Sequence, residues 1–591
     1  MDVPIFHSSM RNLTISLLLI AVLGFAVYAN SLGGAFIWDD IAFIKDNAYI
    51  KDWSNAARIF TLDFSKRLTS GGGIKYNFYR PLHILTYMAD YSLWGLRPEG
   101  YHFTNALFHT LAALALFWLI RALFGGTLLP LVTAALFVVH PIHTEAVAYI
   151  AGRADSMALL FMLLAFVFYV KGVPVIASPE GAKQSKKARL LQPLRGFAMT
   201  TILCYILALL SRENSAILPV LLLLYHYTFK KPCKFTRYAP ILLITIFYLI
   251  FRISMSQNLL AGSGAGNPSI SPERIPGFFA ALTNYVRLLF LPLGLHMEYG
   301  DKLFAMTDPR VITGLVIFTT AIGIALIKRR ADKIIFFSIA WFFIALLPSS
   351  NIYPIGAYMA EHWLYLPSIG FFLLLANGLV SLSLPRKSIR LRIPARLAAK
   401  PRAFAGMTLL IAFYSFLTIK QNNYWRELIP FYERTLAYSP DNPKIYNNLG
   451  AVYYRLGKNE ESIDAYKKAI KLNPYYYETS YNLGAAYHAL KMYDEAIEAY
   501  KKEIAINPAL PKVYNNLGAV YFDIHQYEKS IEAYKKAISL DPKNACMYFN
   551  IGFAYCRIGK YAEAISAYNK SLSIDPSYVN AYNDLGTAYH L

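Results

Sequence analysis

The stretch 443-PKIYNNLGAVYYRLGKNEESIDAYKKAIKLNP-474 decides the fold of the last third of this chain. Its marker residues return at a constant spacing of 34 residues: Gly450, Gly484, Gly518, Gly552 and Gly586, and likewise Pro440, Pro474, Pro508, Pro542 and Pro576. Small residues at helical spacing let two helices pack closely, and the proline ends each pair. The period therefore predicts a stack of helix pairs, each pair burying its apolar face against the next.

A period of about 34 residues with this pattern is typical of tetratricopeptide repeats, which bind other molecules rather than catalyse reactions. The tyrosines and asparagines at helical spacing are interpreted mainly as packing residues, although some on the concave face could hold an extended peptide. A partial repeat from Trp425 to Pro440 is expected to dock the array on the preceding helix. The chain stops at Leu591, inside the first helix of the fifth repeat, which predicts either a truncated sequence or a covering molecule.

The chain before Trp425 has the composition of a membrane domain. Overall 56% of residues are hydrophobic and 16% are charged, whereas soluble proteins have about 25% charged residues. Apolar runs close to the length of a membrane span, about 20 residues, recur throughout. The expected spans are 12–29, 104–122, 127–142, 156–172, 196–211, 214–229, 238–255, 309–327, 333–348, 362–382 and 403–420.

The net charge of +22 is concentrated beside these apolar runs. Most of the excess lies in four segments: Lys171–Arg195, Lys230–Arg237, Lys328–Lys333 and Arg386–Arg402. Basic loops that flank spans are the mark of the cytoplasmic side of a membrane protein. This placement argues against nucleic acid as a partner.

Two further apolar stretches, Tyr79–Trp94 and Phe278–Leu295, are interrupted by charged and polar residues and are expected to lie at the membrane interface. With them set aside, eleven spans leave every basic segment on the cytoplasmic side, with the N-terminus inside. All residues after 420 are then outside. The same threading places the following segments outside: Asn30–Phe103, Pro141–Asp155, Ser211–Asn214 and Pro348–Glu361.

Two adjacent carboxylates open the first outer loop, in the sequence Phe36-Ile37-Trp38-Asp39-Asp40. Asp39 and Asp40 could be solvated loop acids or a helix cap, because Asp is favoured there. Alternatively, one of them is a general base that a hydroxyl acceptor reaches from the aqueous side. Spacing alone leaves both interpretations open.

More ionisable residues gather in the other outer segments, where they are costly near lipid and therefore indicate a functional site. His140, His143 and Glu145 could suggest a metal, but Pro141 breaks the helical spacing that zinc motifs use, so a hydrogen-bonded cavity is favoured. Arg153 has a planar fork suited to phosphate. The remaining members of this set are Asp155, Arg212-Glu213, Glu298-Tyr299 and Glu361-His362. Together they predict a cavity for an anionic, membrane-borne substrate.

At these residues the chain resembles the transmembrane and tetratricopeptide-repeat mannosyltransferase-like proteins, a family of multispanning enzymes that use lipid-phosphate-linked sugars. The resemblance runs through nearly the whole chain, over Trp38-Asp39-Asp40, Tyr79-Arg80-Pro81-Leu82, the run from His140 to Asp155, Leu364-Tyr365-Leu366-Pro367-Ser368 and the repeats. One departure is His362, where many members of the family have arginine.

The resemblance implies a polyprenyl- or dolichyl-phosphate mannose as co-substrate, with no other cofactor. Asp39 or Asp40 would activate a Ser/Thr hydroxyl, and Arg80, Arg153 and His362 would neutralise the phosphate leaving group. The supporting polar cavity would comprise His140, His143, Glu145, Asp155 and Glu361. No metal ligands are assigned. The expected partners are the lipid-linked sugar, membrane lipids, and acceptor proteins held by the repeats.

The sequence therefore predicts an all-α protein with a multispanning domain over 1–424, a partial repeat over 425–442 and a repeat array over 443–591. The leading hypothesis is a protein O-mannosyltransferase. The alternatives are a non-catalytic membrane scaffold, or an enzyme of the same superfamily that acts on lipid or glycan. The repeats would lie in the periplasm of a bacterial inner membrane or in the lumen of the endoplasmic reticulum.

Overall fold

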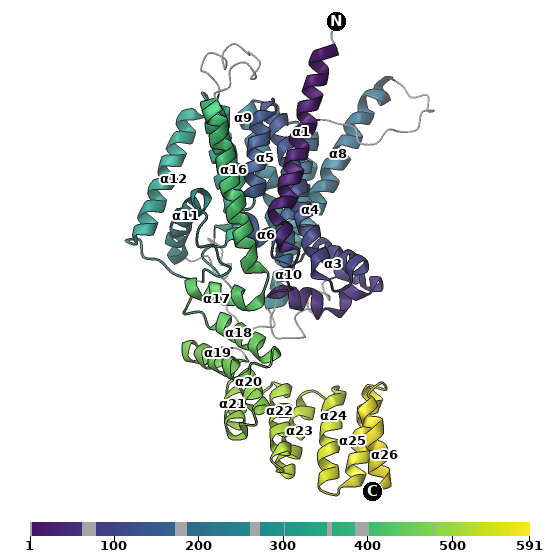
Figure 1. Ribbon diagram of the computed structural model, residues 1–591. Coiled ribbons are helices and arrows are strands. Elements are labelled where there is room, and N and C mark those ends of the chain that lie inside the picture. Colours follow the sequence, from purple (N-terminus) through teal and green to yellow (C-terminus); the bar gives the residue numbers. More distant parts are fainter. Residues whose placement is uncertain are drawn as a thin grey trace. The chain divides into compact units, whose positions relative to one another are not determined.

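The computed structural model describes residues 3–61, 79–171, 186–260, 272–300, 302–350, 357–383, 401–476 and 478–591. It is all-α in these ranges and divides into two compact units, residues 1–427 and 428–591 (Figure 1). Two of the basic segments, 171–195 and 386–402, fall largely outside the described residues, as do 351–356 in the outer segment before Glu361.

Long helices build the N-terminal unit (Figure 1). Their bounds are α1 Val3–Tyr28, α3 Pro81–Trp94, α4 Pro98–Phe124, α5 Leu128–Val139, α6 Thr144–Val147, α7 Arg153–Lys171, α8 Lys186–Ser211, α9 Leu218–Phe229, α10 Phe235–Leu260, α11 Ile275–Phe290, α12 Pro309–Lys328, α13 Lys333–Leu346, α14 Ser368–Ser383 and α16 Pro401–Asn422. The largest apolar cluster lies where α1, α4, α5 and α7 pack together, and it extends to α11, α13 and α14.

Five helical segments in the described ranges are long and apolar enough to cross a membrane, and a bent pair would make six. They are Arg11–Ser31, Pro98–Phe124, Ile150–Lys171, Phe235–Ser254 and Pro309–Lys328, with Leu128–Val139 plus Pro141–Val147 as the pair. Each of the eleven expected spans falls on a helical segment, but several of these helices are too short to meet the same criterion. The two stretches expected at the interface form α3 and α11.

The first and last long helices of this unit are joined by two amides. Asn30 Nδ2 donates to the carbonyl of Ile419 at 2.8 Å, and Asn422 Nδ2 donates to the carbonyl of Val27 at 2.8 Å. Asn422 also donates to Asn30 Oδ1 at 2.9 Å. Helix ends leave carbonyl groups without partners, and these side chains satisfy two of them. The reciprocal pair therefore fixes the ends of α1 and α16 against each other.

The second unit is an array of helix pairs that follows a leading helix, α17 Leu428–Tyr438. The pairs are α18 Pro443–Arg455 with α19 Asn459–Leu472, α20 Thr479–Ala489 with α21 Tyr493–Ile506, α22 Pro511–Asp523 with α23 Tyr527–Leu540, and α24 Ala545–Arg557 with α25 Tyr561–Ile574, followed by α26 Val579–His590. In the first pair Gly450 faces Tyr466, and a methyl group on Gly450 would lie 2.7 Å from that ring. This contact recurs in the next three pairs, which explains the period.

Candidate active site

A tight turn holds the two adjacent carboxylates in the loop after α1. Asp40 is fully buried, and its Oδ2 accepts a hydrogen bond from the Ile37 amide at 3.1 Å, which closes the turn. Its Oδ1 accepts from the Ala151 amide at 2.8 Å. Trp38 lies inside the turn with a φ of +51°, in the left-handed region that residues other than glycine rarely adopt. Asp40 is therefore committed to holding the backbone in this conformation.

Asp39 occupies a different environment from its neighbour. Its side chain is partly exposed, and its amide donates to the hydroxyl of Tyr149 at 3.3 Å. Burial raises the pKa of Asp40 well above its ordinary value, and the nearby charge of Asp39 raises it further, while the two amide bonds and Arg153 lower it. Asp40 precedes the helical turn Ile41–Lys45 but does not cap it through its side chain. Of the two, Asp39 is the one that a substrate can reach.

Arg153 begins α7 and is fully buried. Its guanidinium lies 2.6 Å from Asp90 Oδ2, donates to Asn105 Oδ1 at 2.6 Å and donates to the Tyr101 carbonyl at 2.9 Å. These contacts occupy the guanidinium of Arg153 with groups of α3 and α4. They favour a structural role for this residue. The sequence-based assignment of Arg153 to phosphate stays a prediction.

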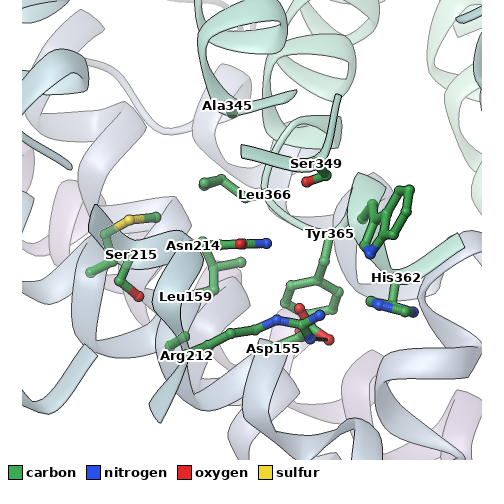
Figure 2. A pocket seen from close by; sticks show the side chains of 13 residues that line it. Asp155, Leu159, Arg212, Asn214, Ser215, Ala345, Ser349, His362, Tyr365 and Leu366 are labelled. Atoms are coloured by element: carbon green, nitrogen blue, oxygen red, sulfur yellow. Dashed lines mark hydrogen bonds and ion pairs between the residues drawn. The ribbon is translucent and has the colours of Figure 1, made fainter. Parts of the chain in front are cut away.

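A polar pocket lies at one end of α7, where Asp155 pairs with Arg212 (Figure 2). Arg212 directly follows α8, and its extended backbone, with φ −159°, separates α8 from the next helical segment, η8 (Glu213–Ile217). Figure 2 shows the side chains of Asp155, Arg212 and His362 toward one side of the pocket and those of Leu366 and Ser349 toward the other. One side of the pocket thus carries an ion pair and an imidazole, and the other carries a leucine and a serine.

His362 reaches this pocket through a contact between distant parts of the chain. Its Nδ1 lies 2.5 Å from Glu145 Oε1, and its amide donates to Glu145 Oε2 at 2.9 Å. Glu145 is placed there because Pro141 ends α5, and the following helical segment turns away by 55°. Glu361 faces another way and accepts from the His296 amide at 2.6 Å and the Tyr299 hydroxyl at 2.7 Å.

Arg80 forms a two-point ion pair with Glu213, with distances of 3.1 and 2.6 Å. Burial alone would raise the pKa of Glu213, but the charge and hydrogen bonds of Arg80 hold that pKa well below its ordinary value. Arg80 directly precedes α3 and Glu213 follows Arg212. The pair therefore joins α3 to the segment that lines the pocket.

Two side chains of α3 lie within electrostatic range of the carboxylate turn or of three arginines. The Tyr87 hydroxyl lies 2.7 Å from His83 Nε2 and donates to the carbonyl of Ile150 at 3.3 Å. Burial lowers the pKa of His83, and the charges of Arg80, Arg153 and Arg212 lower it further. Burial raises the pKa of Tyr87, and the charges of Asp40 and Asp39 raise it further, whereas Arg153 lowers it. The base candidate and the cations therefore lie within electrostatic range of one short helix.

The two predicted cavity histidines lie in the protein interior and do not line the pocket. His140 Nδ1 accepts from the Ile142 amide at 3.2 Å, and its Nε2 lies 3.1 Å from the carbonyl of Leu289. His143 packs among rings, with 4.4 Å between its centroid and that of Phe137 and 4.7 Å to Tyr365. Among the described residues, no set of three His, Cys, Asp or Glu side chains is arranged to hold a metal ion.

The sequence-based prediction counted Arg212 and Glu213 among the outer charged groups but gave neither of them a role in catalysis or phosphate binding. The structure brings Arg212, Asp155 and His362 to one pocket, whereas Arg153 and His140 are enclosed elsewhere. The sequence feature that could have indicated Arg212 as a pocket residue is the charged doublet Arg212-Glu213 between two apolar runs. Asp90 was visible only as an interruption in an apolar stretch.

Comparison with known proteins finds similar proteins for both parts of the chain. Tetratricopeptide repeat models match residues 443–476 and 465–498, and a TPR repeat model matches 489–524, 520–559 and 554–591, which confirms the predicted repeats. A crystal structure of MamA protein is 33% identical, covers 25% of this chain and 81% of its own, and has a TM-score of 0.24.

Curated relatives match a larger part of the chain. A protein O-mannosyl-transferase of Caenorhabditis elegans is 27% identical over 76% of this chain and 61% of its own length. Protein O-mannosyl-transferase TMTC4 of Homo sapiens is 28% identical over 73% and 63%, and TMTC3 of Homo sapiens is 25% identical over 72% and 48%. The chain therefore spans about half to two thirds of the length of these relatives.

Proposed function

We propose that this chain, which belongs to the TMTC family of membrane proteins with tetratricopeptide repeats, is a glycosyltransferase. It moves a sugar, in our proposal mannose, from a polyprenyl- or dolichyl-phosphate donor to Ser or Thr of proteins. The observation that carries this proposal is a partly exposed Asp39, held by the turn that the buried Asp40 closes. One short helix, α3, lies within electrostatic range both of this carboxylate and of Arg80, Arg153 and Arg212.

In the proposed reaction Asp39 accepts the proton of the acceptor hydroxyl. The hydroxyl oxygen forms a bond to the anomeric carbon while the bond from that carbon to the phosphate oxygen breaks, and the configuration inverts. The lipid phosphate leaves with the electron pair. Arg212, Arg80 and His362 stabilise the negative charge that develops on the phosphate. Arg153 has an indirect role, because it holds α3 and α4 in place.

We further propose that the pocket faces the outer side of the membrane, with eleven spans and the N-terminus inside. In Figure 1 α1, α8 and α16 begin on the same side of the N-terminal unit. The basic segments 171–195 and 386–402 lie next to the starts of α8 and α16, so this arrangement is compatible with one cytoplasmic face. Arg212 follows the opposite end of α8, about 39 Å away along a 26-residue helix.

The repeats are proposed to bind the acceptor protein, because tetratricopeptide arrays present extended binding surfaces. The rival proposal is a membrane scaffold without catalysis, in which the same repeats assemble other proteins. The buried turn around Asp40 favours the enzyme, because backbone strain such as that at Trp38 gathers at active sites.

The test is transfer from a lipid-phosphate sugar to a Ser/Thr peptide by purified protein. Asp39→Asn should lose at least about a hundredfold in kcat, the usual scale of general-base catalysis, with thermal stability unchanged. Asp40→Asn serves as the matched neighbour and should lower stability, because its partners are backbone amides. Full activity in Asp39→Asn would refute the base assignment, and absence of transfer with any lipid donor would favour the scaffold.

A further inference from the structure

A second cavity lies between α11, α12, α13 and α14, away from the charged groups of the site. Its volume of about 120 Å³ is below the roughly 300–1,000 Å³ of pockets that enclose a whole ligand, so it has room for a short segment of a chain. Its lining side chains are aliphatic or aromatic apart from Ser338. A charged or strongly polar ligand would lose its hydration there without gaining partners, so the chemistry of this cavity fits a hydrocarbon.

The cavity opens to the outer surface of the N-terminal unit. α12 forms one wall, and only 17% of its span is buried inside the protein. Phe290 of α11, which also lines the cavity, is 59% exposed. In the proposed membrane arrangement this surface faces lipid, and a hydrocarbon chain could enter from the bilayer without passing through water.

Close helix contacts keep the cavity open. A methyl group on Gly370 would lie 2.3 Å from the Ser338 carbonyl oxygen, and one on Gly314 would lie 1.9 Å from that of Phe279. The pairs α13–α14 and α11–α12 therefore touch backbone to backbone. Closing the cavity between the two helix pairs would therefore require each pair to move as a rigid unit.

Side chains of α13 and of the helical turn that follows it, η10 (Leu347–Ser349), line both this cavity and the polar pocket. Ser338 and Phe342 line the apolar cavity, and Ala345 and Ser349, which follow at intervals of three and four residues, line the pocket that holds Arg212 and His362. Such intervals place side chains on one side of a helix. From Ser338 to Ser349 the distance along the axis is about 16 Å.

The segment opposite α13 repeats this order. Leu366 lines the polar pocket, and its carbonyl accepts a hydrogen bond from Trp341 Nε1 at 3.1 Å. Gly370, about one turn further along the chain, lines the apolar cavity. Two neighbouring elements thus line a polar pocket that contains a guanidinium and an imidazole and, next to it, an apolar cavity. This order fits an anionic head joined to a hydrocarbon tail.

We propose that this cavity holds a short segment of the isoprenoid chain of the lipid-phosphate donor while the phosphate lies at Arg212 and His362. This inference rests on the proposed function. Burial of the isoprenoid chain between the helix pairs contributes binding energy. It also determines how far the phosphate lies from Asp39. Donors with chains too short to reach Ser338 would bind the pocket without this contribution.

The first test is photocrosslinking on the full chain in phosphatidylcholine nanodiscs. The reagent is a long-chain polyisoprenyl phosphate with a diazirine near its phosphate end, and a phosphatidylcholine with a diazirine on an acyl chain is the comparison. The polyisoprenyl reagent should label peptides of α11–α14, and unlabelled polyisoprenyl phosphate should compete. Labelling of these helices by phosphatidylcholine, without competition, would overturn the proposal and identify a bulk-lipid site.

The second test uses variants on α12. Ala321→Phe fills the cavity, and the matched control Ile324→Phe places the same ring on a residue of α12 that is 43% exposed. Ala321→Phe should raise KM for a long-chain donor about tenfold, the loss expected when roughly two methylene groups are no longer buried. KM for a short-chain donor, and both values for the control, should not change.

The outcomes separate this inference from the proposed function. If wild type transfers sugar but Ala321→Phe leaves the chain-length dependence unaltered, the tail site is wrong and the function stands. If wild type transfers no sugar yet is crosslinked competitively at α11–α14, the function fails while the lipid site stands. Should Ala321→Phe not fold, crosslinking of wild type decides the question.

Discussion

Arg153 and Arg212 are both buried guanidinium groups, yet they do different things. Arg153 is enclosed by Asp90, Asn105 and a backbone carbonyl, whereas Arg212 pairs with Asp155 at the edge of a pocket. A buried charge that loses its partner destabilises a protein by about 3–5 kcal/mol. A charge beside a pocket can instead be shared with a ligand.

We therefore expect Arg153→Met to lower the free energy of unfolding by about 3–5 kcal/mol, because Asp90 is left buried and unpaired. Arg212→Lys should keep the thermal transition but lower kcat/KM at least tenfold, because lysine has a single charged group in place of the fork. Thermal unfolding in detergent and sugar transfer measure the two effects. The control Arg310→Lys changes an exposed pair and should alter neither. A stable, fully active Arg153→Met would contradict this division of roles.

Glu213 gives the site a defined response to acid. Its pKa is lowered in the folded protein relative to the ordinary value of about 4.3. The ion pair with Arg80 then contributes stability above that pH, and this contribution is lost as the pH falls toward the folded pKa. Glu213→Gln should lower Tm at pH 7, and the gap to wild type should narrow below about pH 4. Glu498→Gln, in an exposed pair, is the control and should show almost no gap. A gap that is constant with pH would show that the loss is not electrostatic.

At the scale of helices, the second repeat starts in an unusual way. Asn442 caps α18 with its side chain, whereas α20, α22, α24 and α26 start without such a cap. Among the residues that precede these helices, Glu478 before α20 is the one with a positive φ, of +53°. Glu503 of α21 reaches this helix end and accepts from the Tyr481 amide at 3.4 Å. It is 1% exposed and occupies the position where other repeats have Ala469 and Ala537. A carboxylate is favoured at a helix N-terminus, where the amides and the dipole are positive.

Glu503→Ala should therefore loosen α20, although it restores the usual residue of the repeat. The measurement is hydrogen exchange of the full chain followed by mass spectrometry. Exchange in the first turn of α20 should become several-fold faster, and α18 and α22 should be unaffected. Glu498→Ala on the exposed face of the same helix is the matched control. Unchanged exchange in α20 would show that the first turn is held by packing alone.

At the scale of the whole molecule, the chain consists of two units with separate apolar clusters. In the proposed function the first unit performs the transfer and the second binds the acceptor protein. A chain ending at Glu427 should keep its thermal transition and its transfer to a short peptide. Its kcat/KM for a folded protein acceptor should fall at least tenfold.

The control for this experiment is a full chain in which residues 428–591 are released by a protease after purification. Both preparations should behave alike. Equal activity of the shortened and full chains on protein acceptors would exclude the repeats from acceptor binding. A tag at Leu591 that is accessible only from the cytoplasmic side would overturn the proposed orientation of both units.

Local pattern was sufficient for the repeats and for the positions of the membrane helices. The 34-residue period is carried by residues close together in the chain, such as Gly450 and Tyr466, which meet within one helix pair. The apolar runs are likewise continuous in the chain. Length alone did not settle how many of these runs are spans, because helices such as α9, with 12 residues, are shorter than the runs that suggested them.

The site depended on contacts between distant residues. Asp39 and Asp40 are neighbours of the same type, and nothing local distinguishes them. Only the packing of Asp40 against Ala151, 111 positions away, buries one and leaves the other partly exposed. The contact of Glu145 with His362 joins residues 217 positions apart.

The sequence by itself therefore determined the helical class, the repeat array, the membrane character of the first unit and the residue types available for chemistry. The tertiary structure decided which of those residues meet: Arg212 with Asp155 at a pocket, and Arg153 with Asp90 in the interior. The physical reason is range. Periodicity and hydropathy act over one helix, whereas burial and ion pairing depend on which helices pack together.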